Sequence, residues 1–79
     1  MTAVDPRELP VTPRQHEVLN LISRGLEYAE IGLVLGISLD TVKTQASRVY
    51  RRLDVHNAAE AVRVGFERGL LTARDPTGR

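Results

Sequence analysis

The sequence predicts an all-α domain of four helices, and three observations lead to this fold class. Apolar residues recur at three- and four-residue spacing in four segments, which is typical of amphipathic helices, and the alternation expected of strands is absent. Three of these segments begin at a Ser, Thr or Asn, the residues that cap helices best. Glycines stand at helix ends and between the second and third segments, where they favour turns.

The predicted helices lie between two terminal segments of a different character. Residues 1–11 contain two prolines and little periodicity, and residues 72–79 add a proline and a glycine. We expect both segments to be flexible arms, which leaves 12–71 as one folded domain. A chain of 79 residues can build one modest core but not a buried enzyme pocket with its supporting residues, so a binding module is the expected class.

The first helix is expected to begin after Thr12 and to end near Gly25. Thr12 is the cap, Pro13 occupies the first helical position, and Gln15 completes a capping box. This helix has an apolar face that packs on a core. The residues of that face are Val18, Leu19 and Ile22, with Leu21 at its edge.

The second helix is expected over 28–35 and is followed by a tight turn. Its start is weak because Glu27 stands where Ser, Thr, Asp or Asn would cap better, although Glu27 and Glu30 complement the positive helix end. Gly36 supplies the turn, because a positive φ angle costs little only for glycine. Ile37 then fills the core beneath the turn.

The third helix is capped by Ser38, extends over about 38–53 and carries two different faces. At about 100° per residue, one apolar stripe is expected in the core. This stripe consists of Val42, Ala46, Val49 and Leu53. The opposite face is polar and consists of Asp40, Lys43, Thr44, Ser47 and Arg51, with Arg48 and Arg52 on one flank and Tyr50 on the other.

Positive charge is concentrated on this third helix. The whole chain has a net charge of only +1, whereas segment 38–53 has four basic residues and one acidic residue, which give it +3. The major groove of DNA accepts one α-helix, whose first turns reach base edges while later arginines reach phosphates. The pattern therefore predicts a helix-turn-helix module that binds double-stranded DNA. The predicted base-contacting residues are Lys43, Thr44 and Ser47, with Asp40 as an acceptor from cytosine, and the predicted backbone-contacting residues are Ser38, Thr41, Arg48, Arg51, Arg52 and Arg14.

The fourth helix is expected over about 58–68. Asn57 and Glu60 form a further capping box, Gly69 ends the helix, and the two leucines that follow fold back onto the core. The expected inward stripe is Ala58, Val62 and Phe66, with Gly65 and Ala61 along its edge and Val64 outside it. The predicted surface for pairing with a second copy is Ala61, Val64, Gly65 and Arg68, and its small apolar area implies a weak homodimer that is stabilised on DNA.

The composition argues against several classes of site. The chain has no cysteine, so it has neither disulfides nor thiolate metal ligands. His16 and His56 are forty positions apart, and no serine, histidine and acid set has a context for nucleophilic catalysis. We therefore expect no enzyme activity, no metal and no cofactor. No apolar run is long enough to span a bilayer and the N-terminal segment is not a signal peptide, so the expected location is the cytoplasm.

A set of short motifs runs through residues 12–71. They are Thr12-Pro13-Arg14, Glu17-Val18-Leu19, Leu21-Ile22, Gly25, Glu30-Ile31, Gly36-Ile37-Ser38, Thr41-Val42-Lys43, Leu53, Val55, Asn57 and Glu60-Ala61-Val62. Together they resemble the DNA-binding domain of the LuxR family, also called the FixJ/NarL or GerE type. The resemblance implies four helices, of which the third contacts DNA and the fourth pairs with its twin on a two-fold site. It also implies DNA contacts by Lys43, Thr44 and Ser47, the same three residues that the helix pattern selects.

Most members of that family attach this domain to a phosphate receiver or a small-ligand sensor, for which 79 residues leave no room. The chain is similar to the short stand-alone members. We therefore expect a sequence-specific transcriptional regulator without a small-molecule ligand of its own. Its abundance or a second protein is the expected form of control.

Several positions depart from the family pattern. Gly32 replaces the usual alanine, which preserves a close approach of the second and third helices, and Asp54 replaces a frequent glycine. Leu33 points away from the core where the family tends to place a charge, and Val34 and Leu39 are also more apolar than expected. We interpret Leu33 and Leu39 as an extra contact surface for a second regulatory protein or RNA polymerase. The alternative is that single exposed apolar residues of this kind are ordinary.

Two other functions remain open at this point. Tyr28-Ala29-Glu30-Ile31 and the glycine turn are also similar to the promoter-binding region of a sigma factor, although the segment from Val55 to Val62 favours the LuxR type. The second is a protein that kept the fold, lost DNA binding and pairs with a full-length regulator, which would suit the near-neutral net charge. Binding to random duplex at two salt concentrations distinguishes a DNA-binding protein from one that only pairs with another regulator, because the affinity of a protein for DNA falls steeply with salt.

Overall fold

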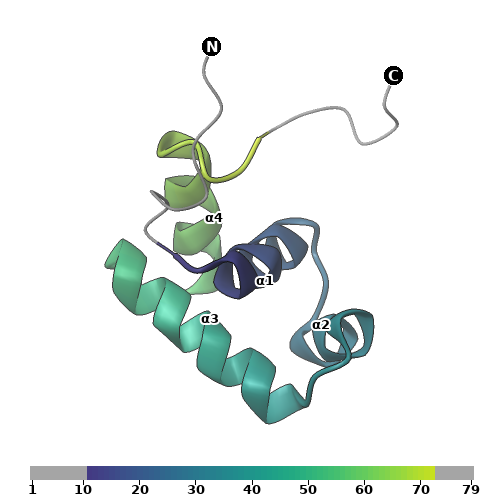
Figure 1. Cartoon of the computed structure of the whole chain (residues 1–79). Coiled ribbons are helices and arrows are strands. Elements are labelled where there is room, and N and C mark those ends of the chain that lie inside the picture. The colour runs from purple at the N-terminus through teal and green to yellow at the C-terminus, as the bar shows by residue number, and fades with distance from the viewer. Residues whose placement is uncertain (1–10, 73–79) are drawn as a thin grey trace, which may run out of the picture.

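The computed structural model describes residues 11–72, which form four α-helices and no strand. In chain order they are α1 (Pro13–Ser23), α2 (Tyr28–Leu35), α3 (Leu39–Leu53) and α4 (Ala58–Glu67). The longest, α3, runs along one edge of the molecule and contacts each of the other three helices (Figure 1). The predicted all-α fold of four helices is confirmed. None of the described helices is long and apolar enough to cross a membrane.

The predicted terminal arms lie outside the described residues except at their inner ends. Val11, which we assigned to the N-terminal arm, is instead 3% exposed and packs in the core. The prediction was wrong at this residue because a valine directly before a helix cap lies close enough to the core to be buried. Thr72, at the other end of the described range, is exposed.

Side-chain caps begin α1 and α3, as predicted. The Thr12 hydroxyl accepts a hydrogen bond from the backbone N–H of Gln15 at 3.1 Å, and the Gln15 side-chain oxygen accepts one from the N–H of Thr12 at 3.1 Å. The Ser38 hydroxyl accepts from the N–H of Thr41 at 3.1 Å. Because these bonds satisfy donors that a helix leaves unpaired at its first turn, they define where both helices begin.

The starts of α2 and α4 differ from the prediction. At α2, the carboxylate of Glu30 accepts from the N–H of Glu27 at 2.8 Å, so this start is better capped than expected. At α4, the Asn57 side chain accepts from the N–H of Glu60 at 2.9 Å, as predicted. The Glu60 carboxylate, however, accepts from the N–H of His56 at 2.7 Å, one residue before the cap. A first-turn glutamate thus stabilises both helix starts.

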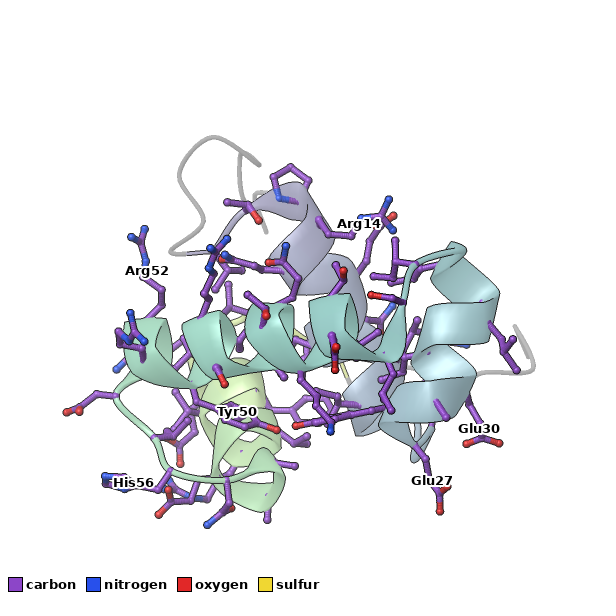
Figure 2. All side chains as sticks on the ribbon, turned by 90° about the horizontal axis from the view of Figure 1, so that it is seen from below. Arg14, Glu27, Glu30, Tyr50, Arg52 and His56 are labelled. Atoms are coloured by element: carbon purple, nitrogen blue, oxygen red, sulfur yellow. The ribbon has the colours of Figure 1, made fainter. Side chains whose placement is uncertain are left out.

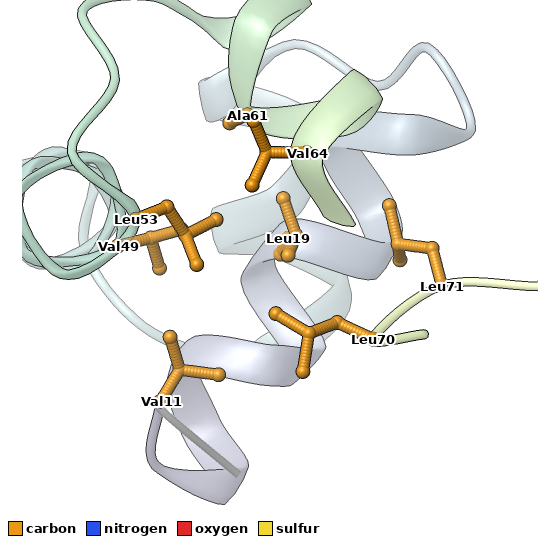
Figure 3. Packing of buried hydrophobic residues seen from close by; sticks show 8 residues of the cluster. All are labelled: Val11, Leu19, Val49, Leu53, Ala61, Val64, Leu70 and Leu71. Atoms are coloured by element: carbon orange, nitrogen blue, oxygen red, sulfur yellow. The ribbon is translucent and has the colours of Figure 1, made fainter. Parts of the chain in front are cut away.

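The core consists of two neighbouring clusters of buried side chains. The first lies between α1, α3, α4 and the segment after α4 (Figure 3), and its members are Val11, Leu19, Val49, Leu53, Ala61, Val64, Leu70 and Leu71. The second lies between α1, α2 and α3, and its members are Val18, Ile22, Ile31, Val42 and Ala46. The stripe predicted on α3 is confirmed, since each of its four residues is at most 1% exposed. The core therefore holds α3 by one face only.

The buried face of α4 is not the one that we predicted. Ala61, Val64 and Gly65 are buried in the chain's own core. Phe66, which was expected inward, is 40% exposed. Ala58 and Val62, the other two residues of the predicted stripe, are half-buried and do pack against the core, so the prediction is correct for them. The predicted pairing surface is therefore wrong for Ala61, Val64 and Gly65, which are not available to a second chain. Arg68, the fourth member of that set, is exposed.

The return of the chain after Gly69 explains this difference. A Cβ atom on Gly65 would lie 2.8 Å from Cδ1 of Leu71, so Leu71 covers the small-residue edge of α4. Nε2 of His16 on α1 donates a hydrogen bond to the carbonyl oxygen of Leu70 at 2.7 Å, which holds the returning segment in place. The small residues of α4 therefore accommodate the chain's own C-terminal segment.

Candidate nucleic-acid interface

The turn between α2 and α3 sets the direction of α3. Gly36 adopts a left-handed φ of 70°, as predicted, and this conformation costs little only for glycine. Gly32 of α2 lies close to the turn and to α3, because a Cβ atom there would lie 2.7 Å from the Ile37 carbonyl oxygen and 3.6 Å from Cγ2 of Val42. No larger side chain fits at Gly32 without a shift of this backbone. The α2–turn–α3 unit is therefore held by direct backbone contact.

The outward face of α3 is exposed along the helix. Figure 2 looks onto the edge of the molecule along which α3 runs in Figure 1. In this view Arg52 of α3 and Arg14 of α1 lie on one side of α3, and Tyr50 lies on the other. The residues of this helix that we predicted to contact DNA are all exposed, and they are Asp40, Thr41, Lys43, Thr44, Ser47, Arg48, Arg51 and Arg52. The structure thus brings the predicted set together on one surface.

The charge on this surface is positive and increases along the helix. Asp40 lies in the first turn, and Arg51 and Arg52 lie in the last turn, so both ends complement the helix dipole. Four basic residues and one acidic residue give segment 38–53 a net charge of +3. By contrast, Glu30 is the one charged residue of α2, and Glu27 directly precedes that helix. A polyanion is therefore attracted to α3 rather than to α2.

Ser38, Thr41 and Arg14 are among the predicted backbone-contacting residues that already make contacts within the chain. The hydroxyls of Ser38 and Thr41 lie 2.8 Å apart at the start of α3. Arg14 lies 3.4 Å from the carboxylate of Glu17, and both side chains remain about half exposed. A phosphate at Arg14 would therefore compete with Glu17, whereas the hydroxyls at the start of α3 could accept or donate further bonds.

The sequence analysis missed a contact between two tyrosines. The hydroxyl oxygens of Tyr28, the first residue of α2, and Tyr50 of α3 lie 2.6 Å apart. The helical pattern placed Tyr50 on a flank of α3 but could not indicate a partner on another helix. The available signal was that a tyrosine at the edge of an apolar stripe needs a hydrogen-bond partner for its hydroxyl.

Exposed apolar side chains lie away from the outward face of α3. The largest exposures are on α2, where Leu33 is 85% and Val34 is 61% exposed, and Leu39 at the start of α3 follows at 44%. On α4, Phe66 is the exposed large apolar residue. Among residues 11–72, no three His, Asp or Glu side chains are grouped in a way that could hold a metal ion.

The fold and this surface define a helix-turn-helix domain whose third helix is basic and polar on its exposed face. The chain belongs to the LuxR family of bacterial regulatory proteins, whose family model matches residues 9–65. The family predicted from the short motifs is thereby confirmed.

Relatives of this chain are named as transcriptional regulators. Transcriptional activator protein YukR of Yersinia ruckeri is 43% identical over 61 residues, which cover 77% of this chain and 27% of YukR. Transcriptional activator protein EsaR of Pantoea stewartii subsp. stewartii is 45% identical over 58 residues, covering 73% and 23% of the two chains. Transcriptional regulatory protein YdfI of Bacillus subtilis (strain 168) is 34% identical over 65 residues, covering 82% and 30%. The chain spans about a quarter of the length of these curated relatives.

Proposed function

We propose that this chain binds double-stranded DNA sequence-specifically through α3 and so regulates transcription. The observation that carries the proposal is the outward face of α3, which is exposed, polar and positively charged while the opposite face is anchored in the core. An α-helix of this kind fits the major groove. The family match favours this function over the promoter-binding region of a sigma factor.

The residues of α3 divide into two groups by their position along the helix. Lys43 and Thr44 occupy the first half of α3 and Ser47 lies just past its middle, and side chains from these turns reach base edges. Asp40 in the first turn is assigned to accept from the amino group of cytosine. Arg51 lies in the last turn and reaches the phosphate backbone. The other backbone contacts come from Ser38, Thr41, Arg48, Arg52 and Arg14.

Selection of bound duplexes from a random pool tests this function directly. We expect enrichment of a short motif, repeated about a two-fold axis, and a steep loss of affinity as the salt concentration rises from about 50 to 200 mM. The absence of salt-dependent binding to any duplex would overturn the proposal. It would favour instead a protein that pairs with a full-length regulator without touching DNA.

Pairing of two copies on such a site is assigned to the outward face of α4. Ala59, Arg63 and Phe66 are exposed and lie four and three residues apart, so they share one side of the helix. Arg63 forms an ion pair with Glu67 at 2.9 Å beside Phe66. Figure 1 shows α4 at the end of the molecule away from α2, and pairing there leaves the outward face of α3 free for DNA. One exposed aromatic side chain implies a weak dimer.

Phe66→Glu is expected to weaken binding to a duplex with two half-sites by about tenfold, because it places a charge in the proposed contact between copies. Binding to a duplex with one half-site should stay unchanged. Gel-shift titrations and sedimentation of both complexes measure this. Leu33→Glu is the matched control, since it introduces the same charge at an exposed apolar residue of another helix. Equal losses on the two duplexes would contradict pairing through α4.

The outward face of α2 is assigned to a contact with a second protein, either a regulatory protein or RNA polymerase. A soluble helix normally places charged residues opposite its buried face, whereas α2 presents Leu33 and Val34 there, with Glu30 as its charged residue. Leu39 extends this apolar surface beyond the turn. Leu33 and Val34 lie on a different helix from the basic face of α3, so DNA and a protein could be bound together.

Leu33→Glu is expected to lower the affinity of purified RNA polymerase for the protein–DNA complex by about fivefold or more, because the charge would be buried in the contact. Affinity for DNA alone should not change. Fluorescence anisotropy of labelled duplex, titrated with polymerase after saturation with this chain, measures both. The Phe66→Glu variant, added at a concentration that saturates the duplex, is the control for the introduced charge. Unchanged polymerase affinity in Leu33→Glu would show that this residue is an ordinary exposed leucine.

A further inference from the structure

The two tyrosine hydroxyls form a direct link between α2 and α3. Tyr28 is the first residue of α2, and Tyr50 lies near the C-terminal end of α3, 22 positions later in the chain. Their oxygens are 2.6 Å apart, so one hydroxyl donates to the other. This is a side-chain contact between two different helices, unlike the bonds within α1 and α4 that cap their starts.

The surroundings of Tyr50 hold its hydroxyl in this bond. Its ring packs against both core clusters, and the ring of Tyr28 packs against the second cluster. Burial, together with the hydrogen bond to Tyr28, raises the pKa of Tyr50 well above its usual range. Tyr50 therefore remains a neutral hydroxyl at any physiological pH, and the link does not depend on pH.

A second point of contact lies between the middle of α2 and the turn that leads into α3. There the backbone of Gly32 touches the Ile37 carbonyl, and the N–H of Ile37 donates to the carbonyl of Gly32 at 3.0 Å. Buried side chains such as Ile31, Val42 and Ala46 also pack between the two helices. Apolar packing is non-directional, whereas a hydrogen bond requires a defined distance and angle and so adds a directional constraint on their relative orientation. The tyrosine link supplies such a constraint, and the base-facing residues Lys43, Thr44 and Ser47 lie between the two contacts along α3.

We infer that Tyr28 and Tyr50 are positioning residues for DNA recognition: their hydroxyl bond sets the rotation of α3 relative to α2 and thus the direction in which its outward face is presented. This inference rests on the proposed function of α3. Base contacts need side chains in a defined position, whereas phosphate attraction tolerates small rotations. Loss of the link therefore lowers specific affinity and leaves non-specific affinity intact.

Three variants test this inference, namely Tyr28→Phe, Tyr50→Phe and the double variant. Each keeps the ring and removes only hydroxyl groups. We expect each single variant to lose about three- to tenfold in affinity for the selected duplex, the range that one hydrogen bond contributes, with unchanged affinity for random duplex and an unchanged salt slope. The double variant should be no weaker than either single variant, because all three lack the same bond.

Ser23→Ala is the matched control, because it removes a hydroxyl that donates to the Asn20 carbonyl at 2.6 Å within α1, away from the α2–α3 contact. It should retain the affinity of the unaltered chain for the selected duplex. Residual dipolar couplings of the free protein provide a readout without DNA. They should show a changed orientation of α3 relative to α2 in all three tyrosine variants and no change in Ser23→Ala.

The outcomes separate this inference from the proposed function. Failure of the unaltered chain to bind any duplex would overturn both. Binding by the unaltered chain, combined with an unchanged helix orientation or with full specific affinity in Tyr28→Phe and Tyr50→Phe, would overturn the positioning role alone. Additive losses in the double variant would also overturn it, because the two hydroxyls would then act separately.

Discussion

Gly32→Val is expected to destabilise the domain by about 3 kcal/mol, a large share of the stability of a domain of this size. A Cβ atom at this position would lie 2.7 Å from the Ile37 carbonyl oxygen, and the two γ-methyl groups of valine would add further contacts. The clashing atom belongs to the backbone, which cannot rotate away as the end of a side chain can. Relief requires a shift of the turn, and this shift would disturb the Ser38 cap and the packing of Val42.

Urea unfolding followed by circular dichroism measures this loss. Ala29→Val is the matched control, because Ala29 lies on the exposed side of the same helix and the change introduces the same side chain. That control should cost only the helix propensity of valine, about 0.5 kcal/mol. A loss for Gly32→Val that does not exceed the control would show that α2 and α3 can separate at this point without penalty.

The helix boundaries were predictable because local signals determine them. Capping side chains at Thr12, Ser38 and Asn57 and left-handed glycines near the helix ends act within four or five residues, so spacing alone reveals them. The apolar stripe of α3 was predictable for a related reason. With four apolar residues at helical spacing and a fully polar opposite side, this helix has only one face that can be buried.

The buried face of α4 was not predictable from the same kind of pattern. Apolar residues lie on more than one side of this helix, so a helical wheel cannot choose between them. The choice is made by Leu70 and Leu71, which return over Gly65 and bury the edge that carries Ala61 and Val64. This packing depends on the path of the chain after the helix. The error mattered for function because it moved the proposed pairing surface to the side of Phe66.

In the candidate site, too, features set by spacing within one helix were predictable, and features set by packing between helices were not. The polar face of α3 follows from helical spacing, so its members could be predicted together. The link between Tyr28 and Tyr50 depends on the angle between two helices, and no spacing within one helix reports that angle. The predicted roles in DNA contact follow from the position of each side chain along α3, and two substitutions separate them.

Lys43→Ala is expected to relax the sequence preference at one base-pair position by about 1–3 kcal/mol. Lys43 is exposed in the first half of α3, where a side chain can reach a base edge in the major groove. Its loss should reduce affinity for the selected duplex and leave affinity for duplexes already altered at that position nearly unchanged. Titration of the selected duplex and its single-base variants measures this difference.

Arg51→Ala is expected to weaken binding to every duplex alike and to reduce the slope of log affinity against log salt by about one. The reason is that Arg51, in the last turn of α3, is proposed to contact a phosphate. Arg63→Ala on α4, measured on a duplex with one half-site, is the control and should change neither quantity, since Arg63 lies outside the outward face of α3 and pairs with Glu67. The two roles are reversed if Lys43→Ala weakens binding to every duplex alike and lowers the salt slope, while Arg51→Ala changes the preferred base. In that case α3 enters the groove with its C-terminal rather than its N-terminal half.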